Sequence, residues 1–288
     1  MEMNNVAIPS ASPEALSIGA LLLDAGKITA SDAERIIQAQ KNKGLRFGDA
    51  AKQLGLITED DIQQILSQQF NFPYLAKTDT IFHHDLIAAY QPFHKQVEVL
   101  RALRSQLMLR WFTKQQKCLS VVSSERSEGR SFICANLAVV FSQLGERTLL
   151  IDADLRQPNQ HSLFKLEQKH GLADILAGRQ NDSAIIQIPQ FRDLSVLPAG
   201  TVPPNPVELI GRSMNECIQQ WQSRYDVILI DTPAFQQGIE AQMLATISAG
   251  ALLLARQNKT RLADMEAMKM ALLESATHCV GAVINEFK

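Results

Sequence analysis

Short apolar runs alternate with amphipathic segments through the second half of the chain. The apolar runs predict buried strands over 119–122, 148–151, 194–197, 225–230, 249–255 and 279–284. Apolar residues at helical spacing between them predict helices over 131–144, 207–224 and 262–276. Strands that alternate with helices in this way predict a parallel sheet with right-handed crossovers and helices on both faces.

Another amphipathic helix is predicted over 94–112. Its expected apolar positions are Val97, Leu100, Leu103, Leu107 and Leu109. In the helix over 262–276, the residues expected to fill the core are Met265, Met268 and Met270. Turn-like residues precede the helix predicted over 94–112. We therefore predict a linker over 77–93 and one domain over 94–288.

The N-terminal part of the chain contains an internal repeat. Residues 17–40 align without gaps to residues 46–69, and seven of the 24 positions are identical. Each copy predicts a short helix, a turn at glycine and a second helix, which Thr29 and Thr58 would start in a capping box. The two copies are expected to pack together as a small α domain over 14–76, after a polar tail over 1–13 that is predicted to be disordered.

Composition narrows the class of protein. A chain of 288 residues suits one large or two moderate domains, and 46% hydrophobic with 20% charged residues is a globular composition. The net charge of −2 gives no reason to expect nucleic-acid binding. No apolar run approaches the roughly 18 residues of a membrane span, and no signal peptide is expected. Four scattered cysteines without C-x-x-C spacing are expected to be reduced thiols.

The stretch over 119–136 carries the strongest candidate chemistry. A strand, a small polar loop and a helix form a typical phosphate site, because loop N–H groups and the helix N-terminus attract anions. Gly129 and Ser131 match the end of the P-loop pattern G-x-x-x-x-G-K-S/T, but Arg130 replaces the lysine and no glycine opens the loop. Taken alone, the stretch fits an ordinary polar turn equally well.

Two other predicted strands each end in carboxylates. Asp152 and Asp154 follow the strand over 148–151, and Asp231 follows the strand over 225–230. Ligands of open parallel sheets bind at the carboxyl ends of the strands. Since Mg²⁺ takes one or two carboxylates with phosphate oxygens and water, we expect Ser131, Asp152 and Asp231 to hold it. Any one aspartate alone is also typical of a helix cap or a turn.

These motifs resemble a known family. Residues 149–158 are similar to the Walker A′ motif of bacterial tyrosine kinases, and residues 227–233 to their Walker B motif. The segments that are also similar are 171–178, 203–206 and 281–285, so the likeness runs from about 94 to 287. The chain most resembles the EpsG-type chain-length-determinant kinases of exopolysaccharide gene clusters. The implied fold is α/β: a doubly wound parallel sheet P-loop domain of MinD/ParA-like type, preceded by the small all-α repeat domain.

The resemblance implies an ATP-dependent protein-tyrosine kinase that uses Mg²⁺. It implies that Asp152 accepts the proton of the attacking hydroxyl, that Asp154 supports it, and that Asp231 orients the water shell of the metal. Asn285 would read adenine. The residues expected to contact the nucleotide are Ser127, which stands where a glycine is usual, Glu128, Gly129, Arg130, Ser131, Phe132 and Asn285.

Assembly and partners are also implied. Glu98, Arg101 and Arg104 match the spacing of the family's oligomerisation motif, although the residues alone equally indicate a solvated helix flank. The implied partner is a membrane-embedded polysaccharide chain-length regulator, which would place the protein in the cytoplasm, peripheral to the inner membrane. Such kinases end in a tyrosine cluster that these closing residues lack, so phosphorylation is expected at Tyr74, at Tyr90 or on another protein.

The duplicated unit resembles the MshEN domain of secretion ATPases, which implies a receptor for cyclic di-GMP. The family pattern begins Arg-Leu-Gly; the second copy has Arg46-Phe47-Gly48, whereas the first has Ser17-Ile18-Gly19. A helical docking module is the alternative. The candidate ligand residues are Gly19, Leu22, Gly26, Gln40, Arg46, Gly48, Gly55 and Gln69.

A second hypothesis concerns the whole chain. A nucleotide-gated assembly subunit related to MinD/ParA-like ATPases would hydrolyse ATP slowly and would have no kinase activity. Arg130 in place of lysine and the missing tyrosine tail favour this hypothesis. The N-terminal repeats would then sense a signal or dock a partner.

Overall fold

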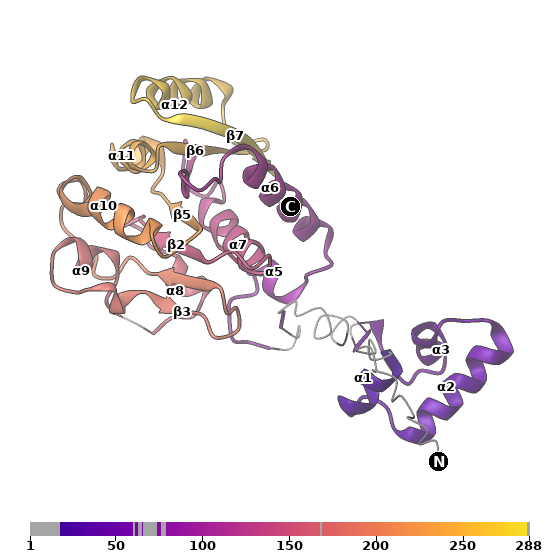
Figure 1. Ribbon diagram of the computed structural model, residues 1–288. Helices are drawn as coiled ribbons and strands as arrows, with labels where there is room; N and C mark the ends of the chain where they lie inside the picture. Colours follow the sequence, from indigo (N-terminus) through magenta and orange to yellow (C-terminus); the bar gives the residue numbers. More distant parts are fainter. Residues whose placement is uncertain are drawn as a thin grey trace, which may run out of the picture. The chain divides into compact units, whose positions relative to one another are not determined.

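The computed structural model describes residues 18–59, 61–62, 65, 74–75, 79–167 and 169–286. The chain divides into two compact units, Met1–Phe72 and Pro73–Lys288, and Figure 1 labels most of their helices and strands. The predicted disordered tail over 1–13 and the candidate ligand residue Gln69 lie outside the described residues.

The first unit is helical. Its helices are α1 (Ile18–Asp24), α2 (Ala30–Lys43) and α3 (Phe47–Gln53), and residues 59, 61–62 and 65 are helical as well. Gly26 and Gly55 occupy equivalent turns with φ of 66° and 67°, a left-handed conformation that glycine adopts at little cost. Thr29 and Asp32 form the predicted capping box, and Thr58 and Asp61 make the same reciprocal contacts in the second copy.

Equivalent positions of the two copies form the core of this unit. Ile28 and Ile36 of the first copy are buried, as are their counterparts Ile57 and Ile65. The α1 and α3 helices approach closely at Gly19, where an added Cβ would lie 3.0 Å from the Phe47 ring. The prediction that the repeats pack their apolar faces together is therefore confirmed for the described residues.

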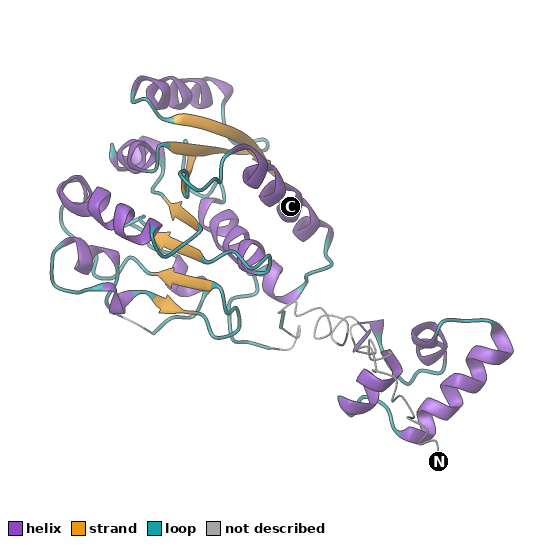
Figure 2. Ribbon diagram, viewed as in Figure 1, coloured by secondary structure: helices purple, strands orange, loops and turns teal. Residues whose placement is uncertain are grey.

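The second unit is built on one sheet (Figure 2). Its strands are β1 (Cys118–Ser123), β2 (Thr148–Asp152), β3 (Ile186–Gln187), β4 (Leu194–Leu197), β5 (Val227–Asp231), β6 (Gly250–Arg256) and β7 (His278–Asn285), in the order β3-β4-β2-β5-β1-β6-β7. Neighbouring strands are parallel, except that β3 pairs antiparallel with β4 at the edge. The parallel sheet was predicted. The edge strand was not, since two residues carry no periodicity.

Helices cover both faces of the sheet (Figure 1). One face packs against α5 (Ile87–Tyr90), α6 (Lys95–Arg110), α7 (Arg130–Ser142) and α8 (Gln160–Leu163). The other packs against α9 (Leu172–Leu176), α10 (Pro206–Gln222), α11 (Glu240–Ile247) and α12 (Leu262–Glu274). In β5, Leu229 faces the first layer while Ile228 and Ile230 face the second, so the doubly wound fold is confirmed. In the described part of the chain, no helix has both the length and the apolar character of a membrane span.

Three details of the predicted pattern are wrong. The predicted linker over 77–93 instead contributes Phe82, Leu86 and Tyr90 to the main core, because its apolar side chains cover the α7 layer. Leu109 is 81% exposed and Met270 is 57% exposed. Each lies two residues from a buried neighbour, and a helix turns about 200° in two residues, which points both side chains away from the core.

Candidate active site

The order of the strands brings the candidate residues together. In the sheet β5 lies between β1 and β2, and Asp231 pairs in register with Val121 on one side and with Asp152 on the other. Since these strands are parallel, their carboxyl ends meet at one edge. The loop over 124–129, which leaves β1, therefore lies beside the two carboxylates.

Both carboxylates are fully buried. The Oδ2 atom of Asp152 accepts hydrogen bonds from the backbone N–H groups of Asn159 (3.0 Å) and Gln160 (2.9 Å). The Oδ2 atom of Asp231 accepts one from Gln160 Nε2 at 2.8 Å. The Oδ1 atoms of both aspartates have no hydrogen-bond partner. Each side chain is thus half satisfied, which is costly for a buried carboxylate.

Burial controls the charge of this pair. Desolvation, with the nearby charge of Asp231, raises the pKa of Asp152 well above its usual range. Burial also raises the pKa of Asp231 to about 6, although the Arg130 charge and hydrogen bonds from Gln160 and Ser131 oppose the shift. Two adjacent buried carboxylates that resist ionisation are stabilised by a nearby cation.

The oxygen atoms available as metal ligands suit a hard divalent cation such as Mg²⁺. The unpaired oxygens are Oδ1 of Asp152, Oδ1 of Asp231 and Oε1 of Gln160, all buried. Carboxylate and amide oxygens are the ligands that Mg²⁺ prefers, and the Ser131 hydroxyl is near enough to Asp231 to lower the pKa of that carboxyl. The chemistry of these groups agrees with the expected set of Ser131, Asp152 and Asp231.

Sequence analysis missed Gln160. This residue begins α8 and is fully buried, and its Nε2 donates to Asp231 Oδ2 (2.8 Å) and to the Ser131 carbonyl (3.1 Å). It therefore joins the end of β5 to the start of α7. Its position in a polar stretch soon after Asp152 was the one available signal, and no periodicity marks such a residue as buried.

Arg130 lies across the base of the loop. Its Nε donates to the Thr232 carbonyl (2.8 Å), and its Nη1 donates to the Glu125 carbonyl (2.7 Å) and to the Ser123 hydroxyl. The guanidinium thus ties the end of β1 to the end of β5. Its charge also lowers the pKa of Asp231, so Arg130 favours the ionised form of the acidic pair.

Asp154 lies next to this group, in the segment that leaves β2. It is buried, its Oδ1 accepts from the Gln157 N–H at 2.9 Å, and burial raises its pKa. Two residues later, Arg156 pairs with the buried Glu240 of α11, with Nε 2.7 Å from Oε1. This pair links the segment after β2 to the segment after β5.

The loop itself has two left-handed residues, Ser127 with φ of 58° and Gly129 with φ of 102°. The conformation at Ser127 costs roughly 1–2 kcal/mol because its Cβ crowds the backbone. Glu128 is fully buried, and its side chain bonds within the protein. Phe132 packs against the core. The groups that Glu128 and Phe132 can offer to a phosphate are therefore backbone N–H groups.

Asn285 contacts the loop directly. Its Nδ2 donates to the Glu128 carbonyl at 3.0 Å, across 157 residues of sequence. The amide group expected to read adenine therefore also supports the loop over 124–129.

The candidate oligomerisation residues lie on α6 and bond within their own unit. Arg101 pairs with Glu98 one turn away, and Arg104 Nη1 donates to the Val140 carbonyl of α7 at 2.8 Å. Burial, with the nearby charge of Arg101, lowers the pKa of Arg104. Arg104 thus helps to pack α6 on α7.

The candidate cyclic di-GMP residues divide into two groups. Leu22 lies in the core, and Gly19 and Gly48 face the Phe47 ring and Ile62 Cδ1, each 3.0 Å from an added Cβ. These three have structural roles, as do the turn glycines. Arg46 is exposed at the start of α3 and Gln40 is half-buried, so their side chains are the accessible ones.

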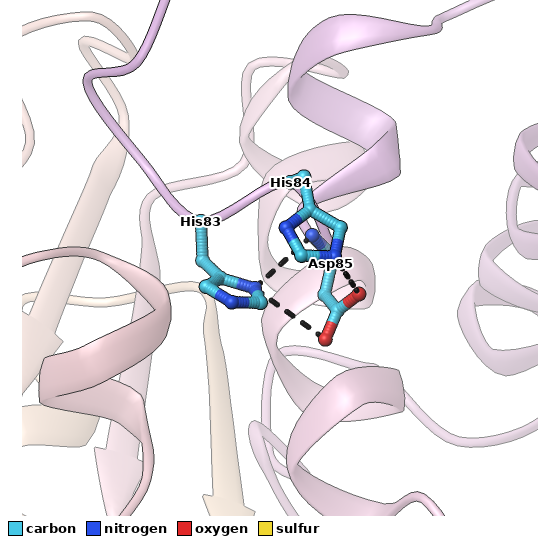
Figure 3. Close-up of side chains that lie close together, drawn as sticks. All are labelled: His83, His84 and Asp85. Atoms are coloured by element: carbon cyan, nitrogen blue, oxygen red, sulfur yellow. Dashed lines mark hydrogen bonds and ion pairs between the residues drawn. The ribbon is translucent and has the colours of Figure 1, made fainter.

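A group of metal-binding residue types lies on the turn before α5, where Figure 3 shows His83, His84 and Asp85. The Asp85 carboxylate lies 3.4 Å from His83 Nδ1 and 3.3 Å from His84 Nε2. Each carboxylate oxygen thus has an imidazole partner, and the His84 side chain is 85% exposed. These contacts form a surface cluster that is separate from the buried carboxylates.

Comparisons with known proteins agree with this geometry. Residues 117–266 match the family described as AAA domain. Tyrosine-protein kinase YwqD of Bacillus subtilis is 34% identical over 202 residues, which cover 70% of this chain and 85% of YwqD. The putative tyrosine-protein kinase CapB of Staphylococcus aureus is 34% identical over 190 residues, which cover 66% of this chain and 83% of CapB.

Solved structures show the same fold. The kinase domain of Escherichia coli tyrosine kinase ETK matches with a TM-score of 0.65 and 29% identity, over 70% of this chain and 79% of that one. The septum site-determining protein MinD of Pyrococcus horikoshii, complexed with Mg-ADP, matches with a TM-score of 0.52 and 28% identity, over 59% and 70%. Because the match to YwqD has 34% identity and covers 85% of YwqD and 70% of this chain, this chain belongs to the bacterial tyrosine-protein kinase family.

Proposed function

We propose that the protein transfers the γ-phosphoryl group of Mg-ATP to tyrosine hydroxyls. The observation that carries the proposal is the pair of buried carboxylates, Asp152 and Asp231, each with an unpaired oxygen beside the loop after β1. Phosphoryl transfer depends chiefly on positioning and on neutralising charge, and a bound Mg²⁺ supplies much of that neutralisation.

Each residue of the site has a separate role in the proposed reaction. Ser131, Asp152 and Asp231 hold the cation, while Arg130 and the N–H groups of 127–131 hold the phosphates. Asp152 accepts the proton of the tyrosine hydroxyl, and Asp154 supports it. Burial raises the pKa of Asp152, and a carboxylate with a higher pKa is a stronger proton acceptor.

The test uses the full chain with labelled ATP and Mg²⁺. We expect phosphotyrosine to form with the wild-type protein and to disappear in Asp152→Ala. Formation of ADP without any phosphoprotein would contradict the kinase proposal and support the nucleotide-gated switch. The likeness to MinD with Mg-ADP and the contacts of Arg130 with backbone carbonyls favour that second candidate.

Accessibility narrows the candidate phosphoacceptors. Tyr90 is buried, and its hydroxyl donates to the Phe82 carbonyl (3.1 Å) and accepts from the Phe82 N–H (2.7 Å). Tyr90 is therefore a poor acceptor, and the expectation that named it is not supported. Tyr74 or another protein remains the proposed target, which mass spectrometry of the labelled protein would identify.

The proposed setting is exopolysaccharide chain-length control, as in the EpsG-type kinases that the chain resembles. The proposal includes homo-oligomers through Glu98, Arg101 and Arg104, and a membrane-embedded partner in the inner membrane. If this is correct, adding the partner's cytosolic tail raises the rate of tyrosine phosphorylation. An unchanged rate would contradict the partner and leave the kinase activity to be judged separately.

The proposed role of the MshEN-like domain, which lies in the unit Met1–Phe72, is to bind cyclic di-GMP. Exposed Arg46 is the side chain best placed for it, because a guanidinium stacks on guanine and grips phosphate. Calorimetry of the full chain should show binding that Arg46→Ala weakens. The absence of heat at high micromolar ligand would favour a docking module.

A further inference from the structure

The end of β6, the segment that follows it and the end of β7 contact the loop over 124–129. Arg256 Nη1 donates to the Ser127 carbonyl at 3.0 Å, and Lys259 Nζ donates to the Arg126 carbonyl. These cations bond to loop residues 129 and 133 positions away in the sequence. Two successive carbonyls of the loop are thus held by one neighbouring segment.

Glu128 is the centre of this contact. Its Oε2 accepts from the Glu125 N–H at 2.8 Å, its Oε1 accepts from the Thr260 hydroxyl, and its own carbonyl accepts from Asn285 Nδ2 at 3.0 Å. The side chain is fully buried and both carboxylate oxygens are bonded. Glu128 therefore joins the start of the loop to two elements outside it.

The direction of the Thr260 hydroxyl is fixed. Its oxygen accepts a hydrogen bond from the Arg256 N–H at 2.7 Å, which leaves its single hydrogen to bond with Glu128. A hydroxyl set in this way holds the carboxylate in one place, and the carboxylate in turn holds the Glu125 N–H. The contact is therefore a chain of oriented bonds.

The loop needs such support because one of its two left-handed positions is occupied by Ser127 and not by glycine. Ser127 adopts φ of 58°, a conformation that side chains other than glycine adopt under strain, and no glycine opens the loop. Strained residues persist where surrounding contacts hold them. The bonds to residues 126–128 from Arg256, Lys259, Thr260 and Asn285 are contacts of this kind.

We propose that Thr260 and Asn285 are positioning residues of the nucleotide site. They act through Glu128 to hold the loop in the shape whose N–H groups receive the phosphates, and they contribute to nucleotide affinity in this way. This inference rests on the proposed function, since it assumes that the loop binds a nucleoside triphosphate.

The first test compares Thr260→Val, which keeps the shape but loses the hydroxyl, with Thr260→Ser, which keeps it. Calorimetry of the full chain with MgADP should show a dissociation constant about tenfold higher for Thr260→Val and about unchanged for Thr260→Ser. The matched control is Thr246→Val, whose hydroxyl bonds to the Gln242 carbonyl of α11, away from the loop. We expect MgADP to bind this control like wild type.

The outcomes separate the inference from the proposed function. If wild-type protein fails to bind MgADP, the proposed function is wrong. If wild type binds and Thr260→Val binds equally tightly, the positioning role is wrong.

A second measurement reports on the loop itself. Hydrogen exchange of a peptide over 123–131 should be faster in Thr260→Val and in Asn285→Ala, and unchanged in Thr246→Val. Because both residues act on Glu128, their effects on MgADP affinity should be coupled in the double variant and not simply additive. Unchanged loop exchange in both single variants, or fully additive effects, would overturn the proposal.

Discussion

The two units of this protein place their important residues in different ways. In the first unit, buried Ile28 and Ile36 recur as Ile57 and Ile65 one repeat later, and each capping pair spans three residues. In the second unit, Gln160 bonds to Asp231 across 71 residues. Local periodicity therefore determines the first unit, whereas long-range packing of strands assembles the site of the second.

The two units also differ in what they bury. Described core residues of the first unit are apolar, so burial stabilises it. The second unit buries Asp152 and Asp231, each with an unpaired oxygen, and this arrangement is costly unless a ligand completes it. The comparison predicts that changes in the apolar core of the first unit lower stability without lowering kinase activity, and that changes at the carboxylates alter activity and stability in opposite directions.

The largest expected effect is on activity. Asp231 ends β5 and Asp226 precedes it, so Asp231→Asn and Asp226→Asn make the same chemical change at opposite ends of one strand. Asp231→Asn should lower kcat by about 100-fold to 1,000-fold, because it removes a charge that would hold the cation. Asp226→Asn breaks a surface ion pair with Arg147 and should change kcat by about twofold at most.

Steady-state phosphorylation of a tyrosine peptide measures both variants. Equal losses in the two would show that the position of Asp231 at the sheet edge is unimportant, which contradicts the proposed site.

The next largest effect is on the stability of the first unit. Ile36 is fully buried and Ile37 is 44% exposed, so the neighbours form a matched pair. Ile36→Ala should lower the free energy of unfolding by about 2–4 kcal/mol, and Ile37→Ala by about 0.5 kcal/mol or less. Hydrogen exchange of α2 amides in the full chain measures this, and MgADP affinity should stay unchanged. A comparable loss in both variants would mean that the core assignment is wrong.

A smaller effect concerns pH. Burial raises the pKa of Asp231 from 3.8 to about 6. The folded protein therefore binds this proton more tightly than the unfolded chain, and the resulting stability is present below about pH 4 and lost as the pH rises through about 6. Asp231→Asn should remove this loss and raise the free energy of unfolding at pH 7 by on the order of 3 kcal/mol.

Denaturant unfolding from pH 4 to pH 7 without Mg²⁺ tests this prediction. The advantage of Asp231→Asn over wild type should grow with pH, and it should shrink when Mg²⁺ and ADP are added. An advantage that is constant with pH would exclude ionisation as its cause.

The smallest effect concerns the helix caps. Thr29→Ala and Thr58→Ala should each lower stability by about 1 kcal/mol, because each removes the acceptor for an N–H group in the first turn of a helix. The variants Thr29→Ser and Thr58→Ser should retain nearly all of the wild-type stability. Thermal unfolding followed by far-ultraviolet circular dichroism measures the losses, and clearly unequal alanine effects would show that the two copies are not energetically equivalent.

Much of the fold could be predicted because its signals are local. The apolar runs gave the strands within one or two residues, and the helices over 207–224 and 262–276 correspond to α10 and α12. The errors concern the side of the helix on which a residue lies. Leu109 and Met270 are apolar, yet both lie on the exposed side of their helices. The segment 79–93 reads as turns, but its apolar residues pack on α7, which composition alone does not reveal.

By itself, the sequence determined the repeat with its capping pairs, the alternation of strands and helices, and the presence of a polar loop and carboxylates at strand ends. Only the tertiary structure decided that β5 lies between β1 and β2, that Gln160 is buried beside Asp231, and that Thr260 and Asn285 hold Glu128. The physical reason is the distance along the sequence over which each kind of interaction acts. Periodicity and capping act over a few residues, whereas these partners meet across 71 to 157 residues and are brought together by the packing of the sheet.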